Sequence, residues 1–294
     1  MGFVIKSIGT FSNRNGSVKS SLELIKKASL KCLDKPEINK EEIDLVINAS
    51  LYRDNYFAEP AFATFVQNEL DINLGKAAFT GSRTFAFDLT NGALGFMNCC
   101  QTIGAMIASG KAKSGLVVSG DVIDFPVDYS GSKPDFMEVG TAMLIEKENG
   151  DIGFGPFHYE IFDDYHDAYK VYKFFEEVFT IRINKNPGLE EILLKCIPTS
   201  MENYLFKTDM SLEDFRYIVP PQISTSFIKK LSDSLGIELD RFIDITWDNK
   251  DLFNACIPMA LQYIIDKKLV QSGDRALIIN AGSGIQVGCT VYNF

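Results

Sequence analysis

The sequence predicts a layered α/β fold made of two similar halves, and three observations predict it. Apolar runs bounded by turns alternate with helical patterns along the whole chain, and the order of these runs repeats. Of the 294 residues, 46% are hydrophobic, which is enough to bury a large core. The repeat predicts two copies of one β-α unit packed about a pseudo-twofold axis. We place the join at the charged turn "EKENGD" near residue 150 and predict the halves 1–150 and 151–294.

The elements of the two halves follow the same order. In the first half we expect a helix, a segment leading to a buried strand, a second strand, a long apolar helix and a third strand, at residues 20–33, 38–50, 86–90, 92–109 and 115–121. In the second half the same series falls at residues 189–205, 210–222, 241–246, 254–265 and 275–284. Asp88 and Asp244 occupy matching places, each near the end of a strand that precedes a long apolar helix.

An aromatic segment at residues 158–179 lies between these two series. Its side chains Phe162, Tyr165, Tyr169 and Tyr172 recur at helical spacing and predict a helix whose aromatic face packs on the core. The alternative interpretation is an aromatic binding site. In either case we expect that this segment can cover one side of a pocket.

Composition and charge exclude several classes of function. Lys and Arg total 29 against 39 Asp and Glu, so the net charge is −10, and an acidic surface repels nucleic acid, anionic membranes and acidic carrier proteins. Six cysteines without C-x-x-C spacing lie mostly in apolar runs, which is typical of reduced, buried thiols. The start "MGFVIKSIGTF" lacks a signal-peptide cleavage site, and Asn98, Gln101 and Thr102 interrupt the most apolar helix. We therefore expect a cytoplasmic protein without a membrane span.

Metal binding is not expected from the histidines. His158 and His166 are the only two in the chain, and their spacing to Asp163, Asp164 and Asp167 matches no known ligand pattern. Partly exposed surface histidines are the commoner outcome. We expect neither a metal ion nor a cofactor.

Five stretches carry a resemblance to a known family. They are "FDLTNGALGF", "FMEVGTAMLIE", "YIVPPQ", "NACIPMAL" and "AGSGIQVG", and their order and spacing matter more than any one of them. Together they resemble the thiolase superfamily, and within it the ketoacyl synthase III group and the olefin-pathway enzyme that condenses two fatty acyl thioesters. The resemblance spans most of the chain and implies a thiolase-like α-β-α-β-α layered fold.

The resemblance puts the family's nucleophile position on a residue without a nucleophile. In the family a cysteine sits in the strand-to-helix turn, where the helix N-terminus lowers its pKa so that it can take the acyl group. That position falls on Ala93, and Gly95 and Phe96 keep the family's trailing Gly-Phe. Cys99 and Cys100 lie about two helical turns, or ~9 Å, further along the axis and do not replace it.

The other two catalytic positions of the family also differ here. The histidine of the family's "P-H-Q" falls on Pro221, which has no titratable group and no donor. The family's asparagine falls on Asp251 if the alignment has no gap, whereas a small shift brings in Asn249 or Asn254 instead.

Two further stretches match functional parts of the family. Glu59-Pro60 matches a Glu-Pro pair of the olefin-pathway enzyme, in a loop that crosses the dimer interface to the neighbour's acyl pocket, where a buried carboxylate can act as a base. The alternative is a solvated loop glutamate fixed by the proline. The turn Gly282-Ser283-Gly284 matches the backbone that builds an oxyanion hole in active relatives. The alternative is that these glycines only let two central strands end close together.

These features predict a non-catalytic subunit that pairs with an active ketoacyl synthase III-like paralogue. The heterodimer would condense or transfer acyl thioesters, in the manner of the nucleophile-less partner in the alkylquinolone condensing heterodimer. The first strand leads almost directly into the first helix, without the family's segment that lines the pantetheine tunnel, so the partner is expected to bind most of the acyl thioester. The alternatives are an acyltransferase or thioesterase that uses Glu59 and the glycine turn, and an acyl-chain-binding protein.

Overall fold

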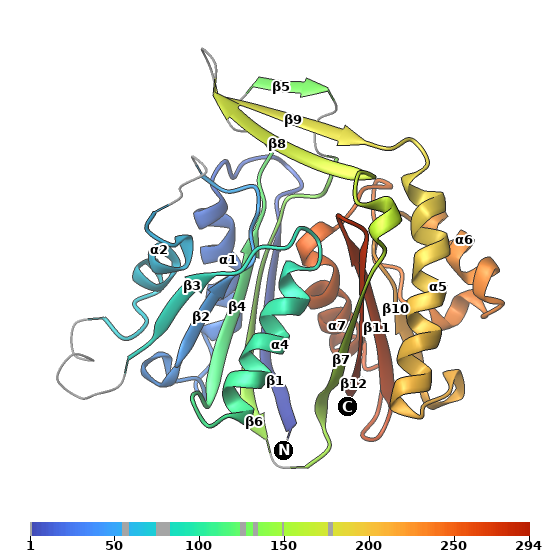
Figure 1. The fold of residues 1–294 in the computed structure, drawn as a ribbon. Helices are drawn as coiled ribbons and strands as arrows, with labels where there is room; N and C mark the ends of the chain where they lie inside the picture. Colours follow the sequence, from blue (N-terminus) through green and yellow to red (C-terminus); the bar gives the residue numbers. More distant parts are fainter. Residues whose placement is uncertain are drawn as a thin grey trace.

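The computed structural model describes residues 2–54, 59–74, 83–123, 128–131, 135–148, 150–175 and 179–294. Figure 1 shows two β-sheets side by side, with helices between them and further helices on the outer face of each sheet. This arrangement confirms the predicted α-β-α-β-α layers.

The first sheet has the strand order β1-β6-β4-β2-β3. Its strands are β1 (Gly2–Ser12), β6 (Val139–Glu148), β4 (Ser114–Gly120), β2 (Leu45–Asn48) and β3 (Phe85–Asp88). β2 runs parallel to β3 and β4, whereas β6 is antiparallel to β1 and β4. β2 and β4 are buried along their whole length, and strands buried on both faces read as apolar runs, which is why the sequence predicts them.

The second sheet has four strands. Its order is β10-β11-β12-β7, made of β10 (Tyr217–Val219), β11 (Arg275–Gly282), β12 (Gln286–Asn293) and β7 (Gly153–Ile161). The strands β7, β12, β11 and β10 correspond in turn to β1, β6, β4 and β2 of the first sheet. The pair β10-β11 is parallel like β2-β4, and the pairs β11-β12 and β12-β7 are antiparallel like β4-β6 and β6-β1. The chain passes from the first sheet to the second between Glu148 and Gly153.

Helices fill the three remaining layers. α4 (Gly95–Ala108) and α7 (Cys256–Asp266) share one core cluster with residues of both sheets, such as Val117 and Ile278. α1 (Ser21–Leu33) and α2 (Phe62–Glu69) pack on the outer face of the first sheet, and α5 (Leu189–Thr208) and α6 (Thr225–Leu235) on that of the second. Short 3₁₀ helices connect them: η1 (Lys40–Glu42), η3 (Asp163–Tyr165), η4 (Leu212–Asp214), η5 (Leu239–Arg241) and η6 (Phe253–Ala255).

The strand predicted at residues 241–246 is wrong. Only Phe242 forms a bridge, to Ile218 at the edge of β10. The side chain of Gln222 takes the place of a neighbouring strand, because its Nε2 donates to the carbonyl of Ile243 at 2.8 Å and its Oε1 accepts the N–H of Ile245 at 2.9 Å. A buried glutamine thus satisfies backbone groups that a β-ladder would otherwise pair.

The helix predicted from the aromatic spacing is also wrong. After η3 the chain forms β8 (Tyr169–Phe175), which pairs antiparallel with β9 (Phe179–Lys185), and β5 (Asp128–Gly131) completes a separate three-stranded sheet. Aromatic and β-branched residues favour strands wherever a pairing partner is present, and β9 supplies that partner. Phe162 and Tyr165 do pack on the second sheet's core, whereas Tyr172 is exposed.

The structure bears on the expected absence of a membrane span and on the expected state of the cysteines. None of the helices in the described ranges combines the length and the apolar character needed to cross a bilayer. All six cysteines are free and buried, as predicted.

Candidate functional site

A cavity of about 510 Å³ is lined by residues at the carboxyl ends of β10 and β11 and by the turn before α4. Residues of the β8–β9 hairpin, which lies above these elements in Figure 1, also line it. Both halves of the chain line it. Its apolar side chains are those of Ala93, Phe136, Ile183, Leu189, Leu193, Pro221, Ile223, Phe253, Ala281 and Ile285. Its polar side chains are those of Asp135, Tyr169, Lys185, Glu190, Ser224, Asn249, Asp251, Asn280 and Ser283.

Ala93 lies in this cavity, in the turn that leads into α4. Asn280 Nδ2 donates to the carbonyl of Ala93 at 2.7 Å, which ties the turn to β11. Asn91 Nδ2 donates to Gln286 Oε1 at 2.8 Å and ties the same turn to β12. The turn therefore has a fixed position at the start of a buried helix, and the side chain it presents to the cavity is a methyl group.

Pro221 lines the same cavity, just after β10. The next residue, Gln222, is 1% exposed, and its hydrogen bonds to Pro220, Ile243 and Ile245 fix the chain on both sides. Pro221 has no proton to give or take at this place.

The structure distinguishes the three candidates for the family's asparagine position. Asp251 and Asn249 both line the cavity with Ala93 and Pro221. Asn254 is buried and absent from the lining, and its Nδ2 donates to Asp121 Oδ2 at 3.0 Å and to the Ala49 carbonyl at 3.3 Å.

Asp251 is a half-buried carboxyl group in the cavity wall, with Phe253, Lys185 and Asp135 near it. Burial raises its pKa from 3.8 to about 6, against the opposing effects of the Phe253 N–H and of Lys185. The Phe253 N–H donates to Asp251 Oδ1 at 2.8 Å. The group is therefore a weak base that can hold or release a proton near neutral pH.

The glycine turn Gly282-Ser283-Gly284 borders the cavity. Gly282 ends β11 and lines the cavity with Ser283, and Gly284 has a φ of +93°, in the left-handed region that favours glycine. The Ser283 hydroxyl lies close to Gly92, where an added Cβ would be 3.3 Å from its oxygen. The glycine turn at residues 282–284 and the turn before α4 thus contact each other beside Ala93.

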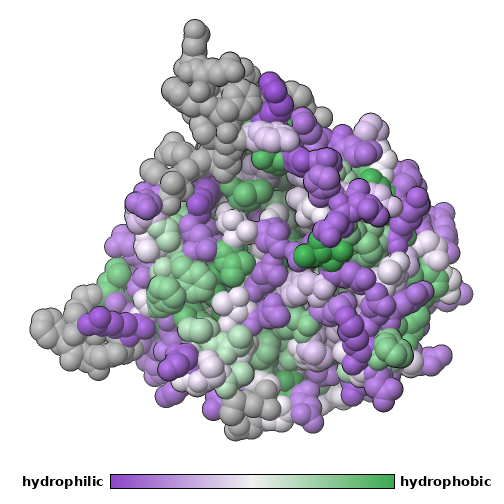
Figure 2. Space-filling view, viewed as in Figure 1, coloured by the Kyte–Doolittle hydropathy of each residue, from purple (hydrophilic) through white to green (hydrophobic). Residues whose placement is uncertain are grey.

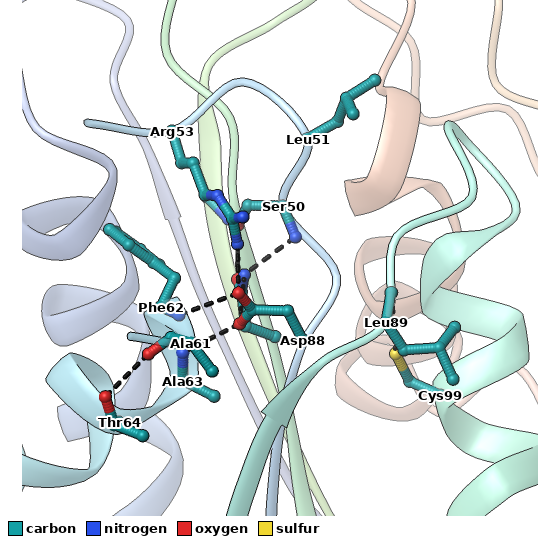
Figure 3. Close-up of polar contacts among 12 residues, drawn as sticks. Ser50, Leu51, Arg53, Ala61, Phe62, Ala63, Thr64, Asp88, Leu89 and Cys99 are labelled. Atoms are coloured by element: carbon teal, nitrogen blue, oxygen red, sulfur yellow. Dashed lines mark hydrogen bonds and ion pairs between the residues drawn. The ribbon is translucent and has the colours of Figure 1, made fainter. Parts of the chain in front are cut away.

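Glu59 lies elsewhere, on the surface of the single chain, where it is exposed. Residues 55–58 of its loop lie outside the described residues. Immediately after Pro60, α2 is fixed by Asp88, whose carboxylate accepts the N–H groups of Phe62 at 2.8 Å and Ala63 at 2.9 Å (Figure 3). Arg53 forms an ion pair with the same carboxylate. Asp88 thus fixes both ends of the loop that carries Glu59.

The cysteines and histidines lie away from the cavity. Cys99 and Cys100 are fully buried in α4, and burial raises the pKa of both thiols. His158 lies on β7 beside Lys207 and Glu160, and His166 follows η3 beside Asp167. No group of three metal-ligating side chains was found in the described ranges of the chain.

Several polar residues of the cavity are not predicted from the sequence, and Asn280 and Lys185 are two of them. Asn280 is 3% exposed inside the otherwise apolar strand β11, and a polar residue in a buried strand is a signal that could have revealed it. Lys185 gives no such signal, because it ends β9, a strand that the sequence does not predict. Tyr169 does line the cavity, so the aromatic segment roofs it as a strand rather than as a helix.

Comparison with known proteins shows the family. The family model for 3-oxoacyl-[acyl-carrier-protein (ACP)] synthase III matches residues 87–161, and the model for the C-terminal part of that protein matches residues 205–294. Together they cover more than half of the chain. It belongs to the ketoacyl synthase III family of the thiolase superfamily.

Full-length relatives of this ketoacyl synthase III-family chain have low sequence identity. The beta-ketoacyl-[acyl-carrier-protein] synthase III of Clostridium acetobutylicum is 27% identical over 291 residues, which cover 93% of this chain and 84% of the relative. That of Clostridium perfringens strain 13 is 25% identical over 285 residues, with the same coverage.

Solved structures share the fold. The ketoacyl synthase III of Thermus thermophilus has a TM-score of 0.83 at 19% identity and covers 99% of each chain. That of Pseudomonas aeruginosa has a TM-score of 0.81 at 18% identity, over 100% of this chain and 98% of the other. OleA of Xanthomonas campestris, solved with lauric acid and lauroyl-CoA, has a TM-score of 0.81 at 16% identity, over 100% and 99%.

Proposed function

We propose that this ketoacyl synthase III-family chain is a non-catalytic cytoplasmic subunit that pairs with an active paralogue. The pair forms an acyl-thioester condensing or acyl-transfer heterodimer, in which the active subunit binds most of the acyl thioester. One observation carries this proposal: Ala93, Pro221 and Asp251 meet in one cavity, and the described residues that line it include neither a cysteine nor a histidine.

The chemistry of that cavity supports the proposal. Thioester condensation in this family requires a thiolate that takes the acyl group and a histidine that assists the reaction. Ala93 and Pro221 offer neither group, and the buried thiols of Cys99 and Cys100 lie inside α4 with raised pKa values. A proline and a methyl group cannot be converted to catalysts by any movement of the surrounding chain.

The edge of the first sheet supports pairing with another chain. β3 is the last strand in the order β1-β6-β4-β2-β3, and Phe85 on it is 60% exposed. In Figure 2 hydrophobic side chains gather over β3 and the neighbouring α4. Phe87 on β3 and Leu89 just after it are partly buried and pack against the core between the sheets. An exposed apolar edge strand is a surface that proteins normally cover, and a second thiolase-fold chain would extend the sheet across it.

Glu59 is the residue that we propose this subunit contributes to its partner. It lies in the loop between β2 and α2, and α2 packs against β3, the strand at the proposed interface. Its exposure in the single chain leaves it accessible to a partner seated on that edge.

The test is co-expression with the active ketoacyl synthase III-like protein encoded nearest to this chain. We would measure the mass of the purified complex and its rate of acyl transfer. We expect a complex of the two chains that is active, whereas each chain alone is inactive or much weaker. Glu59→Ala should lower the activity without dissolving the complex, and Glu37→Ala, on another exposed loop, is the matched control.

Other results separate the alternatives. A complex whose activity is indifferent to Glu59→Ala leaves a partner that only stabilises and shapes the active subunit. A homodimer of this chain that turns over acyl thioesters alone contradicts the proposal and favours a thioesterase or acyltransferase that uses non-standard residues. In that case Ser283→Ala and Asp251→Asn would identify the groups involved.

A further inference from the structure

We propose that the cavity of this chain binds a small organic amine, with Asp251 as the counter-ion of the ammonium group and an aromatic wall around it. The inference concerns the isolated chain and does not depend on the proposed heterodimer. It rests on the hydrogen bonds of one carboxylate, on the arrangement of three aromatic rings, on the charges that line the cavity and on its size.

Asp251 has an incomplete set of hydrogen bonds. In the described part of the chain, the one hydrogen bond that its carboxylate accepts comes from the Phe253 N–H to Oδ1. A carboxylate has about four acceptor sites, and Asp251 is half-buried at the cavity wall, so donors of a bound ligand can complete the set. An ammonium group carries three N–H donors and a positive charge, so it supplies what this site lacks.

Aromatic rings surround the same part of the cavity. Phe136 and Phe253 both line it and are stacked, with ring centroids 5.3 Å apart and an interplanar angle of 17°. Tyr169 lines it from β8, and its hydroxyl lies 3.4 Å from that of Tyr52. The faces of aromatic rings attract cations, and a carboxylate beside such a wall is the usual recognition chemistry of an ammonium ligand.

The charges on the cavity wall favour the same sign of ligand. Three carboxylates, those of Asp135, Glu190 and Asp251, face one ammonium group, that of Lys185. Asp135 and Glu190 also pair with lysines outside the lining, Lys250 at 3.8 Å and Lys230 at 3.0 Å, whereas Asp251 has no ion pair with a described residue. Among the charged groups of the lining, carboxylates outnumber ammonium groups, which favours a cationic ligand over an anionic one of the same size.

The size of the cavity fits a small molecule. Its volume of about 510 Å³ lies within the range of roughly 300–1,000 Å³ that is usual for small-molecule sites. Leu189, Leu193 and Ile285 supply an apolar surface for the body of the ligand, so an amine with a hydrocarbon or aromatic body is the class that matches both parts of the wall.

The test uses three probes of one length, octylamine, octanol and octanoate, titrated into the protein as it purifies at about pH 7 by calorimetry. We expect octylamine to bind at least tenfold more tightly than octanoate, with octanol between them. Asp251→Asn should weaken octylamine binding at least tenfold and leave octanol binding nearly unchanged. Asp240→Asn, an exposed acid remote from the lining, is the matched control and should change neither.

Two outcomes would overturn the inference. The first is octanoate binding as tightly as octylamine to the unmodified protein, a comparison that needs no variant to fold. The second is octylamine binding that is the same in Asp251→Asn and in the control. Phe136→Leu provides a second variant, and it should lower the affinity for octylamine more than that for octanol.

Discussion

Replacing Asp88 with alanine should destabilise the fold by about 3 kcal/mol. The carboxylate accepts the first two N–H groups of α2, from Phe62 and Ala63, and it also accepts a hydrogen bond from Asn48 Nδ2 at 3.3 Å (Figure 3). The residue at the N-cap position, Ala61, has no side-chain acceptor, so Asp88 caps the helix from a neighbouring strand.

The magnitude follows from the groups that lose their partner. Loss of a helix cap costs about 1 kcal/mol. A hydrogen bond to a charged group contributes about 1.5–3 kcal/mol, and the ion pair with Arg53 is of this kind, since the two side chains are only 16% and 14% exposed. The sum is about 3 kcal/mol, and Asp88→Asn, which keeps an acceptor but loses the charge, should cost about half of it.

The assay is urea unfolding of the wild type, Asp88→Ala, Asp88→Asn and the exposed control Asp240→Ala. Amide hydrogen exchange at Phe62 and Ala63 should also become faster in Asp88→Ala, because their acceptor is gone. A loss below about 1 kcal/mol in Asp88→Ala, or one equal to that of the control, would refute the reasoning that a side chain from β3 caps α2.

Three further predictions test the site and the core. Ala93→Cys should be alkylated by iodoacetamide at one position, as seen by mass spectrometry, because Ala93 faces the cavity while the six native cysteines are buried; an unmodified variant would mean that the turn is closed to reagents. Burial raises the pKa of Asp121 from 3.8 to about 6, so the stability that its protonated form contributes is present below 3.8 and is lost as the pH rises through about 6. Between about pH 4 and about pH 7 the free energy of unfolding of Asp121→Asn should therefore fall less, or rise more, than that of the wild type by roughly 2 kcal/mol, and an unaltered pH dependence would contradict this. Gly140→Ala should cost about 2–3 kcal/mol, because its Cβ would lie 2.1 Å from the Leu24 carbonyl oxygen, whereas Gly16→Ala, with a φ of +62° and open space around it, should cost about 1 kcal/mol; equal losses in thermal unfolding would disprove the packing argument.

Most of the fold was predictable because its buried strands and helices have strong local patterns. Strands such as β4 are continuous apolar runs, and α1 begins at a serine that caps it, with Ser20 Oγ accepting the Glu23 N–H at 3.1 Å. The repeated order of these elements also predicted the two similar sheets. The aromatic segment failed, because spacing of three and four residues is compatible with a strand once a pairing partner such as β9 is available.

The sequence by itself determined which side chains are present at the key turns and which family the chain resembles. The methyl group of Ala93 and the proline ring of Pro221 are set by the amino-acid sequence and do not depend on how the chain folds. Only the tertiary structure decided which residue joins them in the cavity: Asp251 and Asn249 do, whereas Asn254, a few residues away, is turned inward to Asp121. Asn249 and Asp251 lie in the turn before η6, whereas Asn254 lies on η6 itself, and the packing of this segment between two sheets that are distant in the sequence sets which side chains reach the cavity.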